Sequence, residues 1–326
     1  MPLDPVAYRP YADPDDFIRE VTDLIWVDRS ISHIYENYEP DSIVHGGYGT
    51  LDTRDEVIQG TLMRIATAPD ITAQAEDIVW EARGDDAFLS SHLVLVSDLL
   101  SPAHSRTIAN CLYRRGVMVE EWVVRDTLAD ALQSGADQDE LARAQAFRGY
   151  GASWTDPAPT DPIVAGDSGP RPDEYRAEVE TVLDMIQTVW NRRDLQKVQK
   201  YFHRDLVLQT VGNRTVIRPE GYRRALLRLL ESFPGGQFEI RDIQTNYDVR
   251  YAGLRVAVLW KFVGDYTGVA NYGPLTGKPI DLLGVSLFTL HNGQIAKEVR
   301  LWDDIALRAQ IAGMRGDEPV GPSNIY

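Results

Sequence analysis

The sequence predicts an α+β fold made of two tandem copies of one unit, each with three helices followed by an antiparallel sheet. Three observations predict it. Both halves run in the order helices, then strands. Charged and apolar residues of the first half recur at fixed offsets in the second. The last strands carry an Asn-Gly pair between alternating apolar residues, which is a strong hairpin signal.

The repeat is visible without gaps over the helical part of each half. Asp41 matches Asp205, 164 positions later, and the same offset pairs Arg29 with Arg193 and Leu62 with Leu226. The same holds for Arg54 with Arg218, Glu56 with Glu220 and Arg64 with Arg228. Near the end of each half the offset grows to 177 and pairs Glu121 with Glu298 and Asp126 with Asp303. Self-similarity over a whole unit indicates duplication.

Composition limits the classes of function. The chain has 326 residues, 44% hydrophobic and 25% charged, with a formal net charge of -16. Such a charge opposes binding to nucleic acid and to anionic membranes. Because Cys111 is the single cysteine, a disulfide framework and a cysteine-rich metal site are excluded. The start of the chain does not resemble a signal peptide, so we expect a cytoplasmic protein.

The first half is predicted as an N-terminal arm, residues 1–14, and a domain, residues 15–133. A helix with Phe17, Val21 and Ile25 on one face comes first, and a short helix follows it. A strand over 42–45 leads through a Gly-rich turn to a helix over 54–68. Four strands are then expected at 71–80, 88–96, 106–113 and 117–125.

Residues 134–172 are predicted as a linker with a short helix over 138–147, because the stretch after that helix is rich in Pro and Gly. The second domain, residues 173–326, opens with a helix whose apolar stripe includes Val182, Val189 and Trp190. A short helix, a strand over 206–211 and a helix over 220–233 follow. Strands are expected at 237–246, 254–263, 280–290 and 294–302, and a closing helix at 305–311.

The final hairpin carries the strongest candidate for chemistry. Counting by twos from Val299 through Leu301 places Asp303 on the same face as these apolar residues. An acid at the end of an inward row is either a helix cap, exposed by a local twist, or placed for chemistry.

Residues 264–304, GDYTGVANYGPLTGKPIDLLGVSLFTLHNGQIAKEVRLWDD, resemble the SnoaL-like polyketide cyclase family of the nuclear transport factor 2-like superfamily. The resemblance extends over nearly all of both halves. It implies a cystatin-like cone in each half, that is, a bent sheet wrapped around helices with a pocket between them. The first half departs from the pattern, since Arg115-Gly116-Val117 replaces the Asn-Gly turn and the Thr-Gly-Lys loop is missing.

The resemblance also implies a mechanism. Characterised cyclases of this family close rings by intramolecular aldol condensation with no metal or cofactor, and an aspartate is the general acid/base. By position, that aspartate resembles Asp303 and Asp126. Burial beside an apolar pocket raises the pKa of a carboxyl toward the working range. The alternative is that each aspartate caps the helix after it.

Two histidines are further candidates. His45 could shuttle a proton, although its counterpart Gln209 does not titrate; the alternative is a solvent-facing strand residue. His92 aligns with Trp260, and a position that accepts either residue is expected to be a half-buried pocket wall.

The remaining candidates are expected to bind substrate. Tyr266 and Ser286 would hold a substrate oxygen, and the aromatic side chains Trp190, Trp260 and Trp122, with His92, would form the wall. No histidine spacing typical of a metal site is present in the sequence.

Two hypotheses follow. In the first, the chain is a cofactor-free acid/base enzyme of cyclase, isomerase or hydrolase type that acts on a small carbonyl-bearing molecule, and the second half is the better catalyst. In the second, the chain is a non-catalytic ligand-binding or dimerisation module with one or both pockets degenerate. The expected partners are a small-molecule ligand and, within the chain, the other half as an internal pseudo-dimer, or a second copy as a homodimer.

Overall fold

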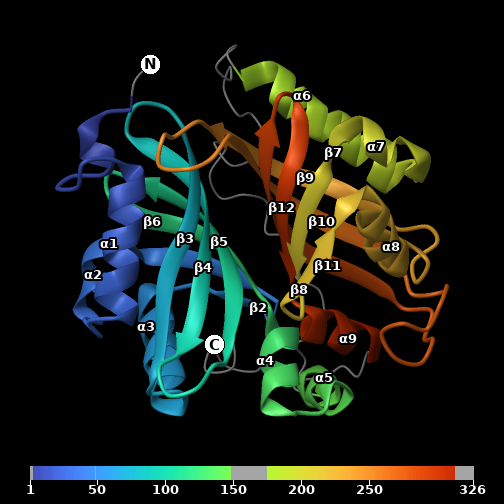
Figure 1. Ribbon diagram of the computed structural model, residues 1–326. Helices are drawn as coiled ribbons and strands as arrows, with labels where there is room; N and C mark the ends of the chain where they lie inside the picture. The colour runs from blue at the N-terminus through green and yellow to red at the C-terminus, as the bar shows by residue number, and fades with distance from the viewer. Residues whose placement is uncertain (1–2, 48, 148–174, 313–326) are drawn as a thin grey trace.

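The computed structural model describes residues 3–47, 49–147 and 175–312. In the first half, a short 3-10 helix (Pro5–Ala7) precedes the domain (Figure 1). The elements are α1 (Pro14–Trp26), α2 (Ser32–Asn37), β1 (Tyr38–Gly46), β2 (Gly49–Leu51), α3 (Arg54–Thr67), β3 (Ile71–Ala82), β4 (Ala87–Asp98), β5 (His104–Arg114) and β6 (Val117–Arg125). Two helices follow the sheet, α4 (Thr127–Ser134) and α5 (Gln138–Phe147). The expected linker beyond 147 lies outside the described residues.

The second half repeats this order. Its first helix is α6 (Arg176–Met185), which continues as a π-helical turn (Ile186–Asn191). The other elements are a 3-10 turn (Leu195–Lys197), α7 (Val198–Tyr201), β7 (Phe202–Thr210), β8 (Arg214–Ile217), α8 (Arg218–Leu230), β9 (Gln237–Asn246), β10 (Leu254–Asp265), β11 (Pro279–His291), β12 (Gln294–Trp302) and α9 (Asp304–Ala312).

Both sheets have six strands in the same spatial order, β2-β1-β6-β5-β4-β3 and β8-β7-β12-β11-β10-β9. Both were expected to be antiparallel, and they are, except for one pair of strands in each. The first strand of each half lies parallel to the last one, β1 beside β6 and β7 beside β12. In each half a helix, α3 or α8, lies in the sequence between the first strand and the last four strands. This long connection allows the first strand to pair in parallel with the last one.

Local sequence accounts for the element boundaries. Asp13 accepts a hydrogen bond from the Asp16 N–H and Pro14 opens α1, a typical helix start. Thr53 caps α3 in the same way, and the Glu56 carboxylate accepts from the Asp52 N–H. In the hairpin β11–β12, Asn292 and Gly293 both have positive φ (49° and 74°), as a type I′ turn requires.

The duplication extends to backbone detail. Arg29 and Arg193 both adopt φ of 60°, in the left-handed region that non-Gly residues seldom occupy. Both guanidinium groups donate to main-chain carbonyls beyond the third helix, Arg29 to Pro69 and Arg193 to Phe233 and Gly236. The same unusual conformation thus makes the same contact in each half.

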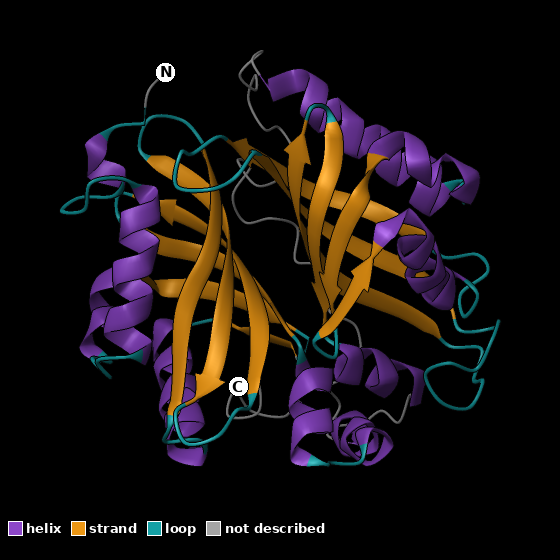
Figure 2. Cartoon of the chain, in the orientation of Figure 1, coloured by secondary structure: helices purple, strands orange, loops and turns teal. Residues whose placement is uncertain are grey.

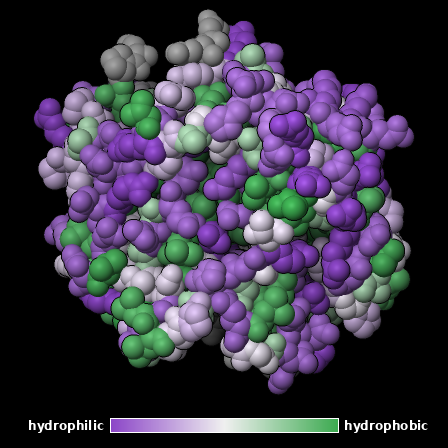
Figure 3. Space-filling model, viewed as in Figure 1, coloured by the Kyte–Doolittle hydropathy of each residue, from purple (hydrophilic) through white to green (hydrophobic). Residues whose placement is uncertain are grey.

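The helices α1–α3 and α6–α8 cover the outer sides of the molecule, and the two sheets lie between them (Figure 2). One hydrophobic cluster includes Trp122 and Val124 of the first sheet together with Leu287 and Val299 of the second. Buried ion pairs also join the sheets, with the Arg83 guanidinium 3.1 Å from the Asp242 carboxylate and Arg255 2.7 Å from Asp77. The face shown in Figure 3 is mostly hydrophilic, with apolar residues scattered over it.

Candidate functional site

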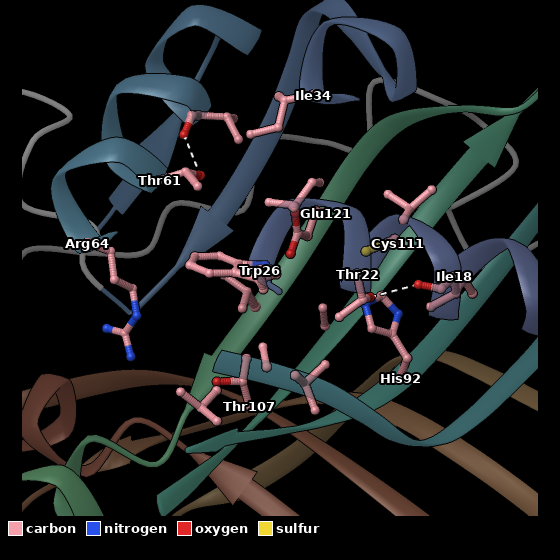
Figure 4. A pocket seen from close by; sticks show the side chains of 18 of the residues that line it. Ile18, Thr22, Trp26, Ile34, Thr61, Arg64, His92, Thr107, Cys111 and Glu121 are labelled. Carbon is pink, nitrogen blue, oxygen red and sulfur yellow. Dashed lines mark hydrogen bonds between the residues drawn. The ribbon is translucent and has the colours of Figure 1, made fainter. Parts of the chain in front are cut away.

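The first half contains a cavity of about 110 Å³ between its helices and the inner face of its sheet (Figure 4). Helix α1 contributes Ile18, Thr22 and Trp26, and α3 contributes Thr61 and Arg64. The hydroxyls of Thr22 and Thr61 donate to the main-chain carbonyls of Ile18 and Val57, so each is bonded within its own helix. The sheet wall is formed by alternate residues of β3 to β6.

The cavity has a closed end and a more open end. At the closed end, the Tyr113 ring stacks on Phe88 at 4.9 Å and meets the edge of Phe17 at 5.1 Å. Going back along β5, the lining residues are Cys111, Ala109 and Thr107, of which only Thr107 is partly exposed. Thr107 pairs across the sheet with Arg125, so a polar threonine and a guanidinium group mark the open end.

Glu121 is the only carboxylic acid among the described residues that line this cavity. It lies on β6, where Glu121, Val123 and Arg125 alternate on the inner face. Burial raises the pKa of the Glu121 carboxyl to about 7, and the nearby positive charge of Arg125 limits the rise. A carboxyl with this pKa exchanges its proton readily near neutral pH.

Three other titratable residues on the wall stay uncharged. Burial lowers the pKa of His92 to about 4, so its imidazole is neutral at physiological pH. His92 lies on β4, level with Ala109 of β5 and Val123 of β6, so its backbone is two strand spacings across and two residues along from Glu121, about 12 Å away. Burial also raises the pKa of the Cys111 thiol and of Tyr113, and both remain protonated.

In the part of the second half that the structure describes, large side chains pack against one another inside the sheet. Trp190 and Trp260 are fully buried and lie edge to face at 6.0 Å, and Phe238 packs on both rings. Glu298, the counterpart of Glu121, accepts a hydrogen bond from Ser286 and lies 3.6 Å from Arg300. Its carboxylate is therefore held within the core.

A comparison with models of protein families gives a match in the second half. Residues 180–311 match the model of the SnoaL-like polyketide cyclase family. The second half is a SnoaL-like domain. Since the first half has the same strand order, the chain is a tandem arrangement of two such α+β units. A comparison with curated protein sequences gave no match.

Several solved structures are similar to one SnoaL-like unit of this chain. A protein from Jannaschia sp. CCS1 described as a SnoaL-like polyketide cyclase is 20% identical, covers 46% of this chain and 99% of its own, and has a TM-score of 0.38. A described polyketide cyclase from Acidithiobacillus ferrooxidans is 19% identical, with 42% and 96% covered and a TM-score of 0.37. IdmH from Streptomyces antibioticus is 17% identical, with 41% and 98% covered and a TM-score of 0.36.

Asp303 does not lie where the strand pattern placed it. Val299 and Leu301 pair with Leu287 and Val285 on the face that meets the first half, whereas Glu298 and Arg300 contact Ser286 and Tyr222 inside the SnoaL-like domain. Asp303 caps α9 by accepting from the Ala306 N–H at 2.8 Å, and it also accepts from the Thr127 hydroxyl at 2.6 Å. Burial raises its pKa to about 6, and the hydrogen bonds from Thr127 and Ala306 limit the rise.

Asp126 occupies the equivalent position in the first half. Its carboxylate accepts from the Ala129 N–H and caps α4. It also accepts from the N–H groups of Gly212 and Asn213 in the β7–β8 turn, at 2.6 and 2.9 Å. Neither aspartate lines the cavity of the first half. The alternative interpretation, a helix cap, describes the geometry of both.

The expected role of His45 also has to be corrected. Its ring is fully buried rather than solvent-facing, and its Nε2 lies 2.8 Å from the Glu120 carboxylate. Trp122 stacks on it at 5.3 Å. Because Trp122 and Glu120 alternate with the cavity residues of β6, both lie on the opposite face of the sheet, and neither His45 nor Trp122 lines the cavity.

The polar groups of the four substrate-binding candidates in the SnoaL-like domain form hydrogen bonds within the protein. These candidates are Tyr266, Ser286, Trp260 and Trp190. The Tyr266 hydroxyl donates to the Gly273 carbonyl and accepts from the Tyr272 N–H, so it belongs to the long loop before β11. Ser286 does face inward, where it accepts from the Trp260 indole N–H at 3.1 Å. Trp190 donates to the Tyr222 hydroxyl. His92 alone among the predicted site residues lines the cavity.

The sequence contained a signal for the residues that were missed. Glu121 is the repeat of Glu298, and the alternation of Glu121, Val123 and Arg125 on one strand face also predicts that the three share a wall. Arg64 belongs to a repeated pair, and the repeat by itself does not indicate that its side chain lines a cavity. Nothing in the sequence indicates which of the two cones is empty, since that depends on which large side chains meet across each interior.

Within residues 3–47, 49–147 and 175–312, no three His, Cys, Asp or Glu side chains gather closely enough to hold a metal. Among the helices of these same ranges, none combines the length and the apolar character needed to cross a membrane.

Proposed function

We propose that this chain is a cofactor-free general acid/base enzyme for a small carbonyl-bearing molecule, and that the reaction takes place in the cavity of the first half. One observation carries the proposal. Glu121 presents a carboxyl with a pKa of about 7 to a cavity that is otherwise mostly apolar. Such a group can both take and return a proton at neutral pH. The similarity of the second half to SnoaL-like cyclases supports the reaction class.

In this proposal the ionised Glu121 removes a proton from the carbon next to the substrate carbonyl. The electron pair of that C–H bond moves to the carbonyl oxygen and forms an enolate, which then closes a ring, isomerises or is reprotonated by Glu121. His92 is neutral and can donate a hydrogen bond to the developing oxyanion. The apolar wall strengthens both interactions because it excludes water.

The filled second half has the role of a scaffold in this proposal. Its sheet covers the outer face of the first sheet, where Trp122 and Val124 would otherwise meet water. We therefore propose that the two halves form an internal pseudo-dimer and that the chain needs no second copy. A solution mass of one chain over a hundredfold range of concentration is expected, and a concentration-dependent doubling would contradict this arrangement.

The rival proposal is a module that binds a ligand without reaction. It is favoured by the position of Asp303 and Asp126, since the residues that resemble the catalytic aspartate of the family form helix caps. Binding without proton transfer distinguishes this proposal from the first.

Exchange of the methyl protons of acetophenone in heavy water, followed by proton nuclear magnetic resonance, tests the proposal without knowledge of the natural substrate. The wild-type protein is expected to accelerate exchange, and Glu121→Gln should reduce the acceleration at least a hundredfold with an unchanged circular dichroism spectrum. Asp303→Asn is the matched control, because an amide oxygen can still cap α9. If Glu121→Gln exchanges as fast as wild type while Asp303→Asn is inactive, the base is Asp303.

A further inference from the structure

The charge of the cavity wall is opposite to the charge of the protein. The chain as a whole carries a formal charge of -16. Among the described lining residues, Arg64 and Arg125 are the cationic side chains and Glu121 is the single acid. With the Glu121 carboxyl near half ionisation at pH 7, the wall has a net positive charge. Two arginines in such a position are unexpected in a cavity that binds only a neutral molecule.

The two arginines lie at the open end. Arg125 is the last residue of β6 and pairs with the partly exposed Thr107. Arg64 lies in the last turn of α3, across the cavity from the sheet (Figure 4). Both are only partly buried, and both also interact with other residues of the chain. Their guanidinium groups can accept an additional anionic partner because each carries five N–H donors.

The distance between the acid and the arginines sets the length of a ligand. Glu121 and Arg125 are four residues apart on one strand, so their backbones are about 13 Å apart. The Arg125 side chain spans part of this distance. A ring near Glu121 with a two- or three-atom arm would therefore reach the open end. The volume of about 110 Å³ is smaller than the roughly 150 Å³ of an apolar cavity that takes up benzene, so it sets an upper limit of one ring, with the arm at the open end.

We propose that this cavity binds a small apolar molecule that carries one acidic group, with the ring toward Cys111 and Tyr113 and the anion at the open end against Arg125 and Arg64. This inference names a substrate class for the proposed function and rests on the same site. Guanidinium groups bind carboxylates through paired N–H donors, and the low polarity of the wall strengthens the attraction.

A pair of isosteric probes tests the anion preference. We would measure the dissociation constants of 3-phenylpropanoate and 3-phenylpropanamide by isothermal titration calorimetry at pH 7.5. The carboxylate is expected to bind the wild-type protein at least tenfold more tightly than the amide. Arg125→Gln and Arg64→Gln should each reduce this preference at least threefold. Arg204→Gln, which removes an equal charge at an exposed site of the second half, should leave it unchanged.

The outcomes that would overturn the inference are specific. Equal binding of the two probes, tighter binding of the amide, no binding of either, or a preference that persists in both arginine variants would each reject it. Thermal unfolding of each variant establishes that the fold is retained. Cys111 gives an independent readout, because it is the single cysteine and lines the cavity. Bound 3-phenylpropanoate should slow its reaction with a small thiol reagent.

The two proposals fail separately. The binding measurements need no turnover, and they are repeated with Glu121→Gln, in which both arginines remain. A tenfold carboxylate preference without any proton exchange would reject the acid/base function and keep the anion site. Proton exchange without a carboxylate preference would reject the anion site and keep the acid/base function.

Discussion

At the scale of residues, Glu121 and Glu298 show how surroundings decide the role of one side chain. Both come from the same position of the repeated unit, and burial raises the pKa of both carboxyls. Glu298 has Ser286, Arg300 and Tyr222 as polar neighbours in a filled core. Glu121 faces a cavity whose nearest charge is Arg125. Glu298 is therefore enclosed by the core, whereas Glu121 is accessible to a ligand.

The raised pKa of Glu121 predicts a pH dependence of stability that belongs to this residue. Between its ordinary value of 4.5 and about 7, the folded protein holds a proton that the unfolded chain has released. The contribution of Glu121 to the free energy of unfolding therefore decreases as pH rises through this window. Glu121→Gln removes this pH dependence. The free energy of unfolding of the variant minus that of wild type should therefore be larger at pH 8 than at pH 5.

Urea unfolding at the two pH values measures this difference. His92 and Asp303 also make stability depend on pH, but both are present in the two proteins, so their contributions cancel in the comparison. The lowered pKa of His92 increases stability as pH rises, and the raised pKa of Asp303 decreases it. A difference between wild type and Glu121→Gln that is the same at both pH values would show that Glu121 titrates normally.

At the scale of elements, the sequence predicted the order and approximate limits of most helices and strands. The offset between the halves, the Asn292-Gly293 turn and the helix over 138–147 were all found in the structure. The parallel pairing of β1 with β6 was not predicted, because alternation along one strand says nothing about its neighbour. Which face of β12 points into the cone was predicted wrongly, since both faces of that strand are buried.

The packing inside the second cone depends on a close contact between the Trp260 ring and Gly284 of the neighbouring strand. A Cβ atom at Gly284 would lie 2.1 Å from the Trp260 ring, so glycine leaves the space that the indole occupies. The alignment of His92 with Trp260 in the sequence is wrong by this register: Trp260 lies level with Gly284 and Trp302, and the equivalent row of the first half is Val94, Thr107 and Arg125. The smaller Val94 leaves room for a cavity there. A single position of β4 and β10 thus accounts for part of the difference between the two interiors.

Trp260→Ala is predicted to open a cavity in the second half. The loss of a fully buried tryptophan should lower the free energy of unfolding by about 3–5 kcal/mol. Part of this loss should be recovered when benzene is added, which urea unfolding with and without benzene would measure. The control is Trp26→Ala, whose half-buried ring already borders a cavity and should cost less. A larger loss for Trp26→Ala would contradict the difference that we infer between the cones.

At the scale of the whole molecule, the two halves depend on polar contacts buried between the sheets. Arg83, which directly follows β3, is 4% exposed, and it pairs with Glu81 of β3 and with Asp242 of β9. Both acids have another donor, since Glu81 accepts from the Thr245 N–H and Asp242 from the Gln244 side chain. Removing one member of such a buried group leaves an uncompensated charge.

The geometry predicts that substitutions of Arg83 and of Asp242 lower the free energy of unfolding by different amounts. Arg83→Met leaves two buried carboxylates without their shared cation, so the free energy of unfolding should fall by about 3–5 kcal/mol. Asp242→Asn leaves Arg83 paired with Glu81 and keeps an amide oxygen for Gln244, so it should cost less than half as much. Urea unfolding followed by tryptophan fluorescence compares them, with Arg115→Met at the exposed Arg115–Asp86 pair as control. Because the group joins the two sheets, both halves should lose stability together in one transition. Equal costs for the two variants, or a loss confined to one half, would show that the sheets are held by their apolar contacts alone.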